Sequence, residues 1–333
     1  MNQKRTLIMR CLLILFTLLP GVFSCQRAPA SGEASGEADA RDSMRIVFVT
    51  HGQSADPFWS VVSNGAHDAA QDLGVHVQYQ APARFDMVEM SNLISAATAA
   101  RPHGLVVSIP DPAALATAIR AAAVAGIPVM SINSGADAYR ELGVLVHVGQ
   151  TEYEAGFAAG ERLADAGVSH ALCINHEVGN AAQDQRCLGL ADALAQDGAA
   201  ATVLGVNLAD PDDVQQRIAN ALRADASIDG MLTLGPAGAD PALAAVRETR
   251  PGGFAFGTFD LTSRVLEALR DGEMLFAIDQ QQYLQGYLPV VMLVKYLETR
   301  TLPGGGDIIR TGPGFVTRAD AAAVIDLTAR GIR

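Results

Sequence analysis

The sequence predicts an α/β fold made of two doubly wound lobes, each a parallel sheet with helices on both faces. Short apolar runs alternate with amphipathic segments from about residue 43 onward, which is the pattern of βαβ units. The alternation runs through one series and then begins again. At 333 residues the chain is also too long for one ordinary domain and suits two.

The first series predicts four strands joined by three helices. Its short apolar runs, read as buried strands, are RIVFVT, VHVQYQ, GLVVSI and IPVMSI. Amphipathic segments between them predict helices near residues 58–73, 86–101 and 112–125. Helical connections of this kind make the strands parallel and cover both faces of the sheet.

The second series begins after VLVHVG and has the same form. Its predicted strands are HALCIN, ATVLGV, GMLTL, FAFGTF and MLFAID. Its predicted helices run over 152–166 and 182–196 and start at Pro211, Pro241 and Thr262. A last apolar helix near YLQGYLPVVMLVKYLE stops at a turn formed by Pro303 and the glycines 304–306.

The N-terminus predicts export. Residues 1–24 combine a basic start with the apolar stretch LLILFTLLPGVF, which is short for a membrane span and typical of a signal peptide. The string VFSC resembles the lipobox of bacterial lipoproteins, so we expect a diacylglyceryl group at Cys25. The alternative is simple cleavage that frees a periplasmic protein. Residues 25–43 have the composition of a flexible linker.

The charge balance excludes some partners. The whole chain carries a formal charge of −12, and loss of the basic signal leaves the exported form near −15. A strongly acidic body argues against nucleic acid and against electrostatic binding to a membrane surface.

Two of the four cysteines remain for the folded body. Cys11 leaves with the signal and Cys25 is the anchor, so Cys173 and Cys187 are left in an oxidising compartment. We expect a disulfide between them that spans INHEVGNAAQDQR. Two buried free thiols are the alternative, because a sequence does not show whether the geometry permits a bond.

Motifs for cofactor, metal or nucleophile chemistry are missing from the sequence. The loop after the first strand, THGQSADPFWS, has neither a dinucleotide-binding glycine pattern nor a P-loop. His176 and Glu177 would need a second histidine at position 180 to form a zinc motif, and that position is Asn180. Asp210 is better explained as a helix N-cap before Pro211 than as a calcium ligand. We therefore expect neither cofactor nor metal.

Polar loops follow the predicted strands, where ligands bind in open parallel sheets. They are HGQSADP, SIPDP, INSGAD, INHEVGN, LGPAGAD and TFDLT. Together with DPFW, GVHVQYQ, GIPVMSIN, GTFD and IDQQQYLQGY in this order, the chain from about Arg45 to Ile325 resembles the type I periplasmic sugar-binding proteins of ABC importers, close to the ribose-binding branch.

The resemblance implies two lobes joined by three crossings, with the ligand between them. It implies a first lobe of 44–149 plus 281–310 and a second of 150–280 plus 311–333. On the first lobe, Phe58 and Trp59 match the aromatic pair that covers the sugar ring, and Asp56 matches a hydroxyl-binding position. The structural alternative is a helix start, with Asp56 as N-cap and one aromatic in the core.

On the second lobe the resemblance assigns Arg186 to paired hydroxyls, Asp260 to a hydroxyl-accepting carboxylate and Gln280 to the hinge. Phe259 adds a second apolar wall unless it is a buried strand-end residue. The chain departs from ribose binders at Asn133 and Ser134, which replace an Asp-Arg pair and leave the identity of the ligand open. In GPAGAD the backbone of Gly235 and Pro236 is expected to replace a ligand-binding Asn.

These observations predict a non-enzymatic, monomeric solute receptor without a cofactor. Its ligand is a monosaccharide or related polyol, and its partners are the transmembrane permease subunits of an ABC importer. A periplasmic sensory module for a chemoreceptor or sensor kinase is the rival interpretation. A transcriptional repressor with the same lobes is excluded by the export signal, and nothing in the sequence supports an enzyme.

Overall fold

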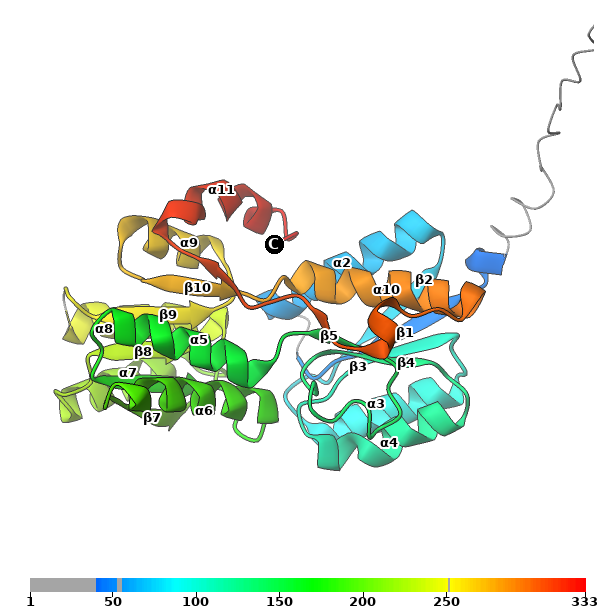
Figure 1. The fold of residues 1–333 in the computed structure, drawn as a ribbon, viewed down its shortest axis with the longest axis horizontal. Helices are drawn as coiled ribbons and strands as arrows, with labels where there is room; N and C mark the ends of the chain where they lie inside the picture. The colour runs from blue at the N-terminus through cyan, green and yellow to red at the C-terminus, as the bar shows by residue number, and fades with distance from the viewer. Residues whose placement is uncertain (1–39, 53–55, 251) are drawn as a thin grey trace, which may run out of the picture.

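The computed structural model describes residues 40–52, 56–250 and 252–333. The predicted signal peptide and Cys25 lie outside the described residues. Figure 1 shows two α/β lobes lying side by side along the long axis of the molecule. Each lobe contains one six-stranded, mostly parallel sheet, which confirms the predicted fold class.

The first lobe is built on a sheet with the strand order β11-β5-β4-β3-β1-β2, and its neighbouring strands are parallel. Its central strands are wholly buried, as expected of a sheet covered on both faces. Its strands are β1 (Arg45–Val49), β2 (His76–Gln80), β3 (Gly104–Ser108), β4 (Val129–Asn133), β5 (His147–Gly149) and β11 (Ile309–Arg310).

The second lobe repeats this plan with the order β12-β10-β9-β8-β6-β7. All its neighbouring strands are parallel except β12, which runs antiparallel to β10. Its strands are β6 (His170–Asn175), β7 (Ala200–Gly205), β8 (Gly230–Thr233), β9 (Ala255–Phe259), β10 (Phe276–Asp279) and β12 (Gly314–Val316).

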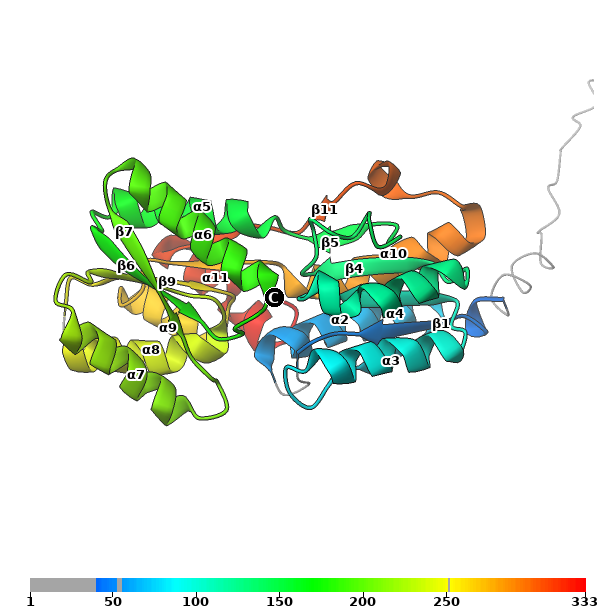
Figure 2. The same cartoon turned by 90° about the horizontal axis from the view of Figure 1, so that it is seen from below.

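Helices cover both faces of each sheet. In the first lobe α2 (Pro57–Leu73) and α10 (Gln282–Thr299) pack on one face, with α3 (Met87–Ala99) and α4 (Pro112–Val124) on the other (Figure 1). In the second lobe α5 and α6 lie opposite α7 and α8 (Figure 2). The helices of the second lobe are α5 (Glu152–Asp165), α6 (Ala181–Gln196), α7 (Pro211–Ala224), α8 (Pro236–Thr249), α9 (Ser263–Asp271) and α11 (Arg318–Ala329).

Asp-Pro pairs start three of these helices. Asp56, Asp111 and Asp210 each accept a hydrogen bond from a backbone N–H of the first turn, and a proline occupies the first helical position in each case. The cap satisfies an N–H that the helix leaves without a partner, and proline has none to lose there. The predicted caps at Asp56 and Asp210 are confirmed.

The start of α8 differs from the prediction. The helix begins at Pro236, and Pro241 lies inside it. Proline at an interior position usually breaks a helix, which is why the sequence suggested a start there. That prediction is wrong because Pro236 occupies the first helical position and Pro241 follows within the first two turns.

Glycines let two helix pairs approach closely. A Cβ on Gly65 of α2 would lie 2.1 Å from the carbonyl oxygen of Tyr283, and one on Gly286 of α10 would lie 1.9 Å from that of Val62. In the second lobe Gly156 of α5 meets the backbone of α6 in the same way. Each contact therefore fixes its two helices as a unit.

The disulfide predicted between Cys173 and Cys187 is present, with a Cα–Cα distance of 5.9 Å. It joins the buried strand β6 to α6, and both cysteines are almost fully buried. Within the described part of the chain no helix combines the length and apolarity that crossing a bilayer requires.

Replacing both cysteines by alanine should destabilise the second lobe by about 3 kcal/mol, because the bond closes a loop with a sequence separation of 14. Thermal unfolding with and without reductant measures this effect. Reductant should lower the melting temperature of the wild type and leave that of the double variant unchanged. Equal sensitivity of the two proteins would contradict a stabilising bond.

Candidate functional site

A chamber lies between the lobes at the carboxyl ends of both sheets, and its side chains leave a free volume of about 40 Å³. Ligands of open parallel sheets bind at this end of the strands. The first lobe contributes His51, Asp56, Phe58, Trp59 and Asn133. The second lobe and the crossing at 280 contribute the remainder, which are His176, Glu177, Asn180, Ala182, Gln183, Arg186, Leu234, Gly235, Pro236, Ala237, Asp260 and Gln280.

The first-lobe wall is aromatic. Phe58 and Trp59 meet edge to face with ring centroids 4.9 Å apart, and His51 meets Trp59 in the same manner at 4.8 Å. Both of the predicted aromatics line the chamber, although each also packs in the core of the lobe. Gly52 makes room for the indole, because a Cβ there would lie 1.6 Å from Nε1 of Trp59.

Asp56 faces the chamber and caps α2 at the same time. Its Oδ1 accepts a hydrogen bond of 2.9 Å from the backbone N–H of Phe58. Burial raises the pKa of Asp56 to about 6, with the charge of Glu177 acting in the same direction and the Phe58 bond against it. Asp56 can therefore cap α2 and face the chamber at the same time, so its two predicted roles do not exclude each other.

The guanidinium of Arg186 organises the second-lobe wall. Its Nε donates to Oε2 of Glu152 at 2.6 Å, one Nη to the carbonyl of Leu234 at 3.1 Å, and the other Nη to Oε1 of Gln280 at 2.9 Å. The guanidinium lies over the ring of Phe259, 4.2 Å from its centroid. Three of its five N–H groups donate to these partners, and Arg186 also lines the chamber.

Asp260 stands beside this group. It accepts bonds of 2.9 Å on both oxygens from Nε2 of Gln280 and one of 3.2 Å from Gln282. Burial raises the pKa of Asp260 well above its usual range, and the nearby Arg186 only partly offsets this. Asp260 has a φ of 68° and Asn133 a φ of 61°, so both strand ends adopt the left-handed conformation that Asp and Asn tolerate best.

The chamber adjoins the three places where the chain passes between the sheets. Gln150, on the first crossing, donates to Oε2 of Glu152 at 2.9 Å. Gln280 lies on the second crossing, and Gln285 joins its carbonyl to Thr311 on the third with bonds of 3.1 and 3.2 Å. Side-chain amides thus connect the crossings to one another and to Arg186.

Two predicted site residues lie outside the lining. The hydroxyl of Ser134 accepts from the backbone N–H of Ile109 at 3.1 Å, so it supports the loop after β3. Phe259 is fully buried beneath Arg186. Of the two roles considered for Phe259, an apolar wall of the chamber or a buried strand-end residue, the second is correct. Phe259 ends the inner strand β9 and its side chain lies in the core.

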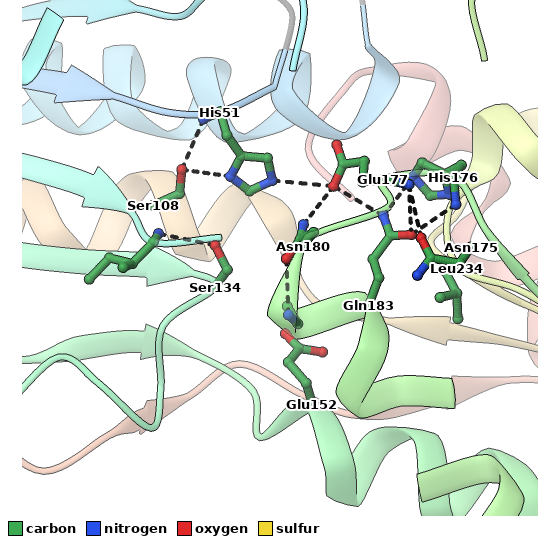
Figure 3. Close-up of polar contacts among 12 residues, drawn as sticks. His51, Ser108, Ser134, Glu152, Asn175, His176, Glu177, Asn180, Gln183 and Leu234 are labelled. Atoms are coloured by element: carbon green, nitrogen blue, oxygen red, sulfur yellow. Dashed lines mark hydrogen bonds and ion pairs between the residues drawn. The ribbon is translucent and has the colours of Figure 1, made fainter. Parts of the chain in front are cut away.

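Five polar lining residues were not predicted as site residues, namely His51, His176, Glu177, Asn180 and Gln183. His176 and Glu177 lie in INHEVGN, one of the polar loops that follow predicted strands, but the incomplete zinc motif gave neither residue a role of its own. Their position directly after β6 was the available signal. Figure 3 shows these side chains converging from the two lobes.

The chamber is acidic. Asp56, Glu177 and Asp260 line it, whereas Arg186 is the only Lys or Arg among the described lining residues and is paired with Glu152 behind the wall. Such a surface suits a neutral ligand rich in hydroxyl groups. Within the described ranges no group of three or more His, Cys, Asp and Glu side chains is arranged to hold a metal ion.

The chain belongs to the periplasmic binding proteins. The sequence profile of the periplasmic binding protein domain matches residues 46–301, which confirms the predicted family. Family membership places the protein in the periplasm.

Known relatives agree in sequence and in fold. The chain is 37% identical to a carbohydrate transporter of Acidothermus cellulolyticus 11B crystallised with myo-inositol, with a TM-score of 0.83 over 87% of this chain and 99% of that one. It is 27% identical to the xylose/arabinose-binding protein XylF of Sulfolobus acidocaldarius, covering 88% of this chain and 75% of that protein. A periplasmic sugar-binding protein of Legionella pneumophila is 25% identical, with a TM-score of 0.75 over 81% of this chain and 99% of that one.

Glu152→Gln should lower the free energy of unfolding by about 3 kcal/mol, because it leaves the buried charge of Arg186 without its partner. Glu154→Gln is the matched control, since Glu154 pairs with Arg310 on the surface, where such a pair contributes about 1 kcal/mol or less. Chemical denaturation of both variants measures the difference. Equal losses of unfolding free energy in the two variants would show that the buried ion pair contributes no more than the surface pair.

Gly52→Ala should displace Trp59, the only tryptophan of the chain, from its buried position. The expected result is a red-shifted tryptophan emission and a lower melting temperature, because Trp59 also packs in the core of the lobe. Gly238→Ala serves as control, because the nearest atom to its added carbon is 4.0 Å away. An unchanged emission in Gly52→Ala would mean that the loop accommodates the methyl group by moving elsewhere.

Proposed function

We propose that this protein is the solute-binding component of a bacterial ABC importer and closes over a monosaccharide or related polyol. The observation that carries the proposal is the chamber itself, in which an aromatic wall on one lobe faces a polar wall on the other. Sugars and cyclic polyols present apolar C–H faces and a rim of hydroxyls, so they need both kinds of surface at once.

Ligand hydroxyls find complementary groups on both lobes. Asp56 and Asp260 offer carboxylate oxygens as acceptors, and Arg186 offers N–H groups as donors. Asn133 supplies an amide that both donates and accepts. Trp59 and Phe58 supply the apolar contact. We infer that these residues, with Gln280 holding Arg186 and Asp260, form the ligand contacts.

A neutral polyol is the ligand class that the charges favour. The neutral Asn133 and Ser134 replace the charged pair expected in ribose binders, and the carboxylates of the chamber oppose sugar acids and sugar phosphates. The myo-inositol bound to the Acidothermus relative, which shares 37% identity with this chain, supports a cyclic polyol.

The two lobes close by moving about the three crossings. We infer that residues 44–149 with 281–310 move against 150–280 with 311–333, which agrees with the division of β11 and β12 between the two sheets. Ligand contacts both lobes only when they are closed, so binding shifts the population toward the closed form that a permease receives. The role is binding without catalysis, and a lipid at Cys25 holds the protein at the membrane.

Calorimetry of the exported protein against neutral and acidic sugars tests the proposal. We expect myo-inositol, xylose, arabinose or ribose to bind and the corresponding uronic acids and phosphates not to bind. Deletion of the gene should also abolish uptake of the ligand that binds. A protein that binds no carbohydrate or polyol, or prefers the acids, contradicts the proposal.

Asp260→Asn should weaken binding of that ligand by about 2 kcal/mol, because the amide turns an acceptor into a donor and leaves buried polar groups mispaired. Asp240→Asn is the control, since Asp240 pairs with Arg264 on the surface. The measurement is the dissociation constant of the ligand for each variant, compared with that of the wild type. If Asp260→Asn binds as tightly as the wild type, the ligand lies elsewhere.

A further inference from the structure

A histidine and a glutamate meet across the chamber from opposite lobes. Nε2 of His51, directly after β1, lies 3.5 Å from Oε2 of Glu177, which follows β6 (Figure 3). The two side chains are 2% and 16% exposed, so the contact is largely shielded from water. An attraction between charges is stronger in such surroundings than on the surface.

His51 is held so that it can point only across the cleft. Its backbone N–H donates to the hydroxyl of Ser108 at 2.9 Å, and its Nδ1 lies 2.8 Å from the same hydroxyl. The imidazole edge packs against the rings of Trp59 and Phe85. These contacts all come from the first lobe, so they persist when the lobes separate.

Glu177 is held equally firmly by the second lobe. Its Oε2 accepts from Nδ2 of Asn180 at 2.6 Å and from Nε2 of Gln183 at 3.1 Å, and its backbone N–H donates to Asn175 at 3.0 Å. Burial alone would raise its pKa, but His51, His176 and Asn180 together lower it to about 2. The carboxylate therefore remains ionised throughout the pH range in which a histidine titrates.

His51 and Glu177 lie between the chamber and a second, outer pocket. Both residues line the chamber and also line a wider outer pocket that reaches Arg84 and Leu208 at the mouth of the cleft. Beside them the backbone N–H of Ala181 donates to the carbonyl of Pro110 across the lobes at 3.0 Å. The contact thus forms where closed lobes separate the chamber from the mouth.

We propose that His51 and Glu177 form a latch that holds the lobes closed over the ligand and that strengthens as pH falls. The inference rests on the proposed solute-binding function and adds positioning residues to it. Each partner is already fixed within its own lobe, so forming the latch costs little side-chain entropy. Separation of the lobes breaks the contact.

The sign of the pH effect follows from the charges. Falling pH favours the protonated form of an imidazole, and only the protonated ring adds charge attraction to Glu177. Other titratable groups face the same ring. They are Asp56 at the start of α2, and His176 beside Glu177, whose pKa burial lowers. The charge of Glu177 raises the pKa of Asp56 and that of His51 lowers it, so wild type and each latch variant are also compared in an Asp56→Asn background.

The test compares His51→Gln, Glu177→Gln and the double variant, with His67→Gln as control. Glutamine retains polar groups without the charge, and His67 is an exposed histidine on α2 of the same lobe. The probe is myo-inositol or the tightest ligand of the calorimetric panel. Stopped-flow fluorescence of Trp59 gives association and dissociation rates at pH values from 6 to 8.5.

We expect each latch variant to release the ligand about tenfold faster than wild type at pH 6, with little change in the association rate. The difference should shrink toward pH 8.5, and the double variant should resemble each single variant. His67→Gln should follow the wild type. Rates that match wild type at every pH, or losses that multiply in the double variant, overturn the latch, since multiplied losses indicate two independent ligand contacts.

Failure of the latch is distinguishable from failure of the proposed function. If the wild type binds a sugar or polyol and the variants release it normally, only the latch is wrong. If no ligand of the panel binds, small-angle X-ray scattering of the ligand-free protein tests the latch on its own. A radius of gyration that falls from pH 8.5 to pH 6 in wild type but not in Glu177→Gln supports the latch, and identical profiles overturn it.

Discussion

One buried guanidinium holds the binding site and the hinge together. Arg186 projects from α6 into the cleft, and its three engaged nitrogens reach the start of α5, the end of β8 and the second crossing. A buried cation is tolerated only with a partner and full hydrogen bonding, and Glu152 supplies the charge. Because Glu152 follows the first crossing directly, a group that lines the chamber is anchored by residues at the crossings between the lobes.

This anchor depends on how closely α5 and α6 pack. A Cβ on Gly156 would lie 2.0 Å from the carbonyl oxygen of Arg186, so a glycine there lets the two backbones touch. The same contact sets the distance from Glu152, one turn earlier, to the guanidinium. The disulfide between Cys173 and Cys187 holds the other side of α6 against β6. Packing, a covalent bond and an ion pair therefore fix a single side chain.

The alternation of apolar runs was sufficient to predict the two lobes. The Asp-Pro pairs at Asp56 and Asp210 predicted helix starts because capping is a local property, whereas Pro241 lies inside a helix that begins at Pro236. Asp56, Trp59, Arg186 and Asp260, which the family motif predicts as site residues, all line the chamber. His51 and Glu177 could not be paired from sequence, since each is an ordinary loop residue until the two sheets face each other. Ser134 and Phe259 were placed in the chamber although their side chains point elsewhere, which sequence spacing alone does not reveal.

Several helix N-termini surround the chamber, and this explains how its carboxylates are tolerated. Asp56 and Asn180 cap α2 and α6, Pro236 begins α8, and Gln280 lies just before α10. Each such terminus carries a partial positive charge of roughly half an elementary unit from its aligned peptide dipoles. These termini offset part of the cost of burying carboxylates beside them, although burial still raises the pKa of Asp56 and Asp260. The backbone at the helix starts therefore shares with Arg186 the task of stabilising a cleft rich in hydrogen-bond acceptors.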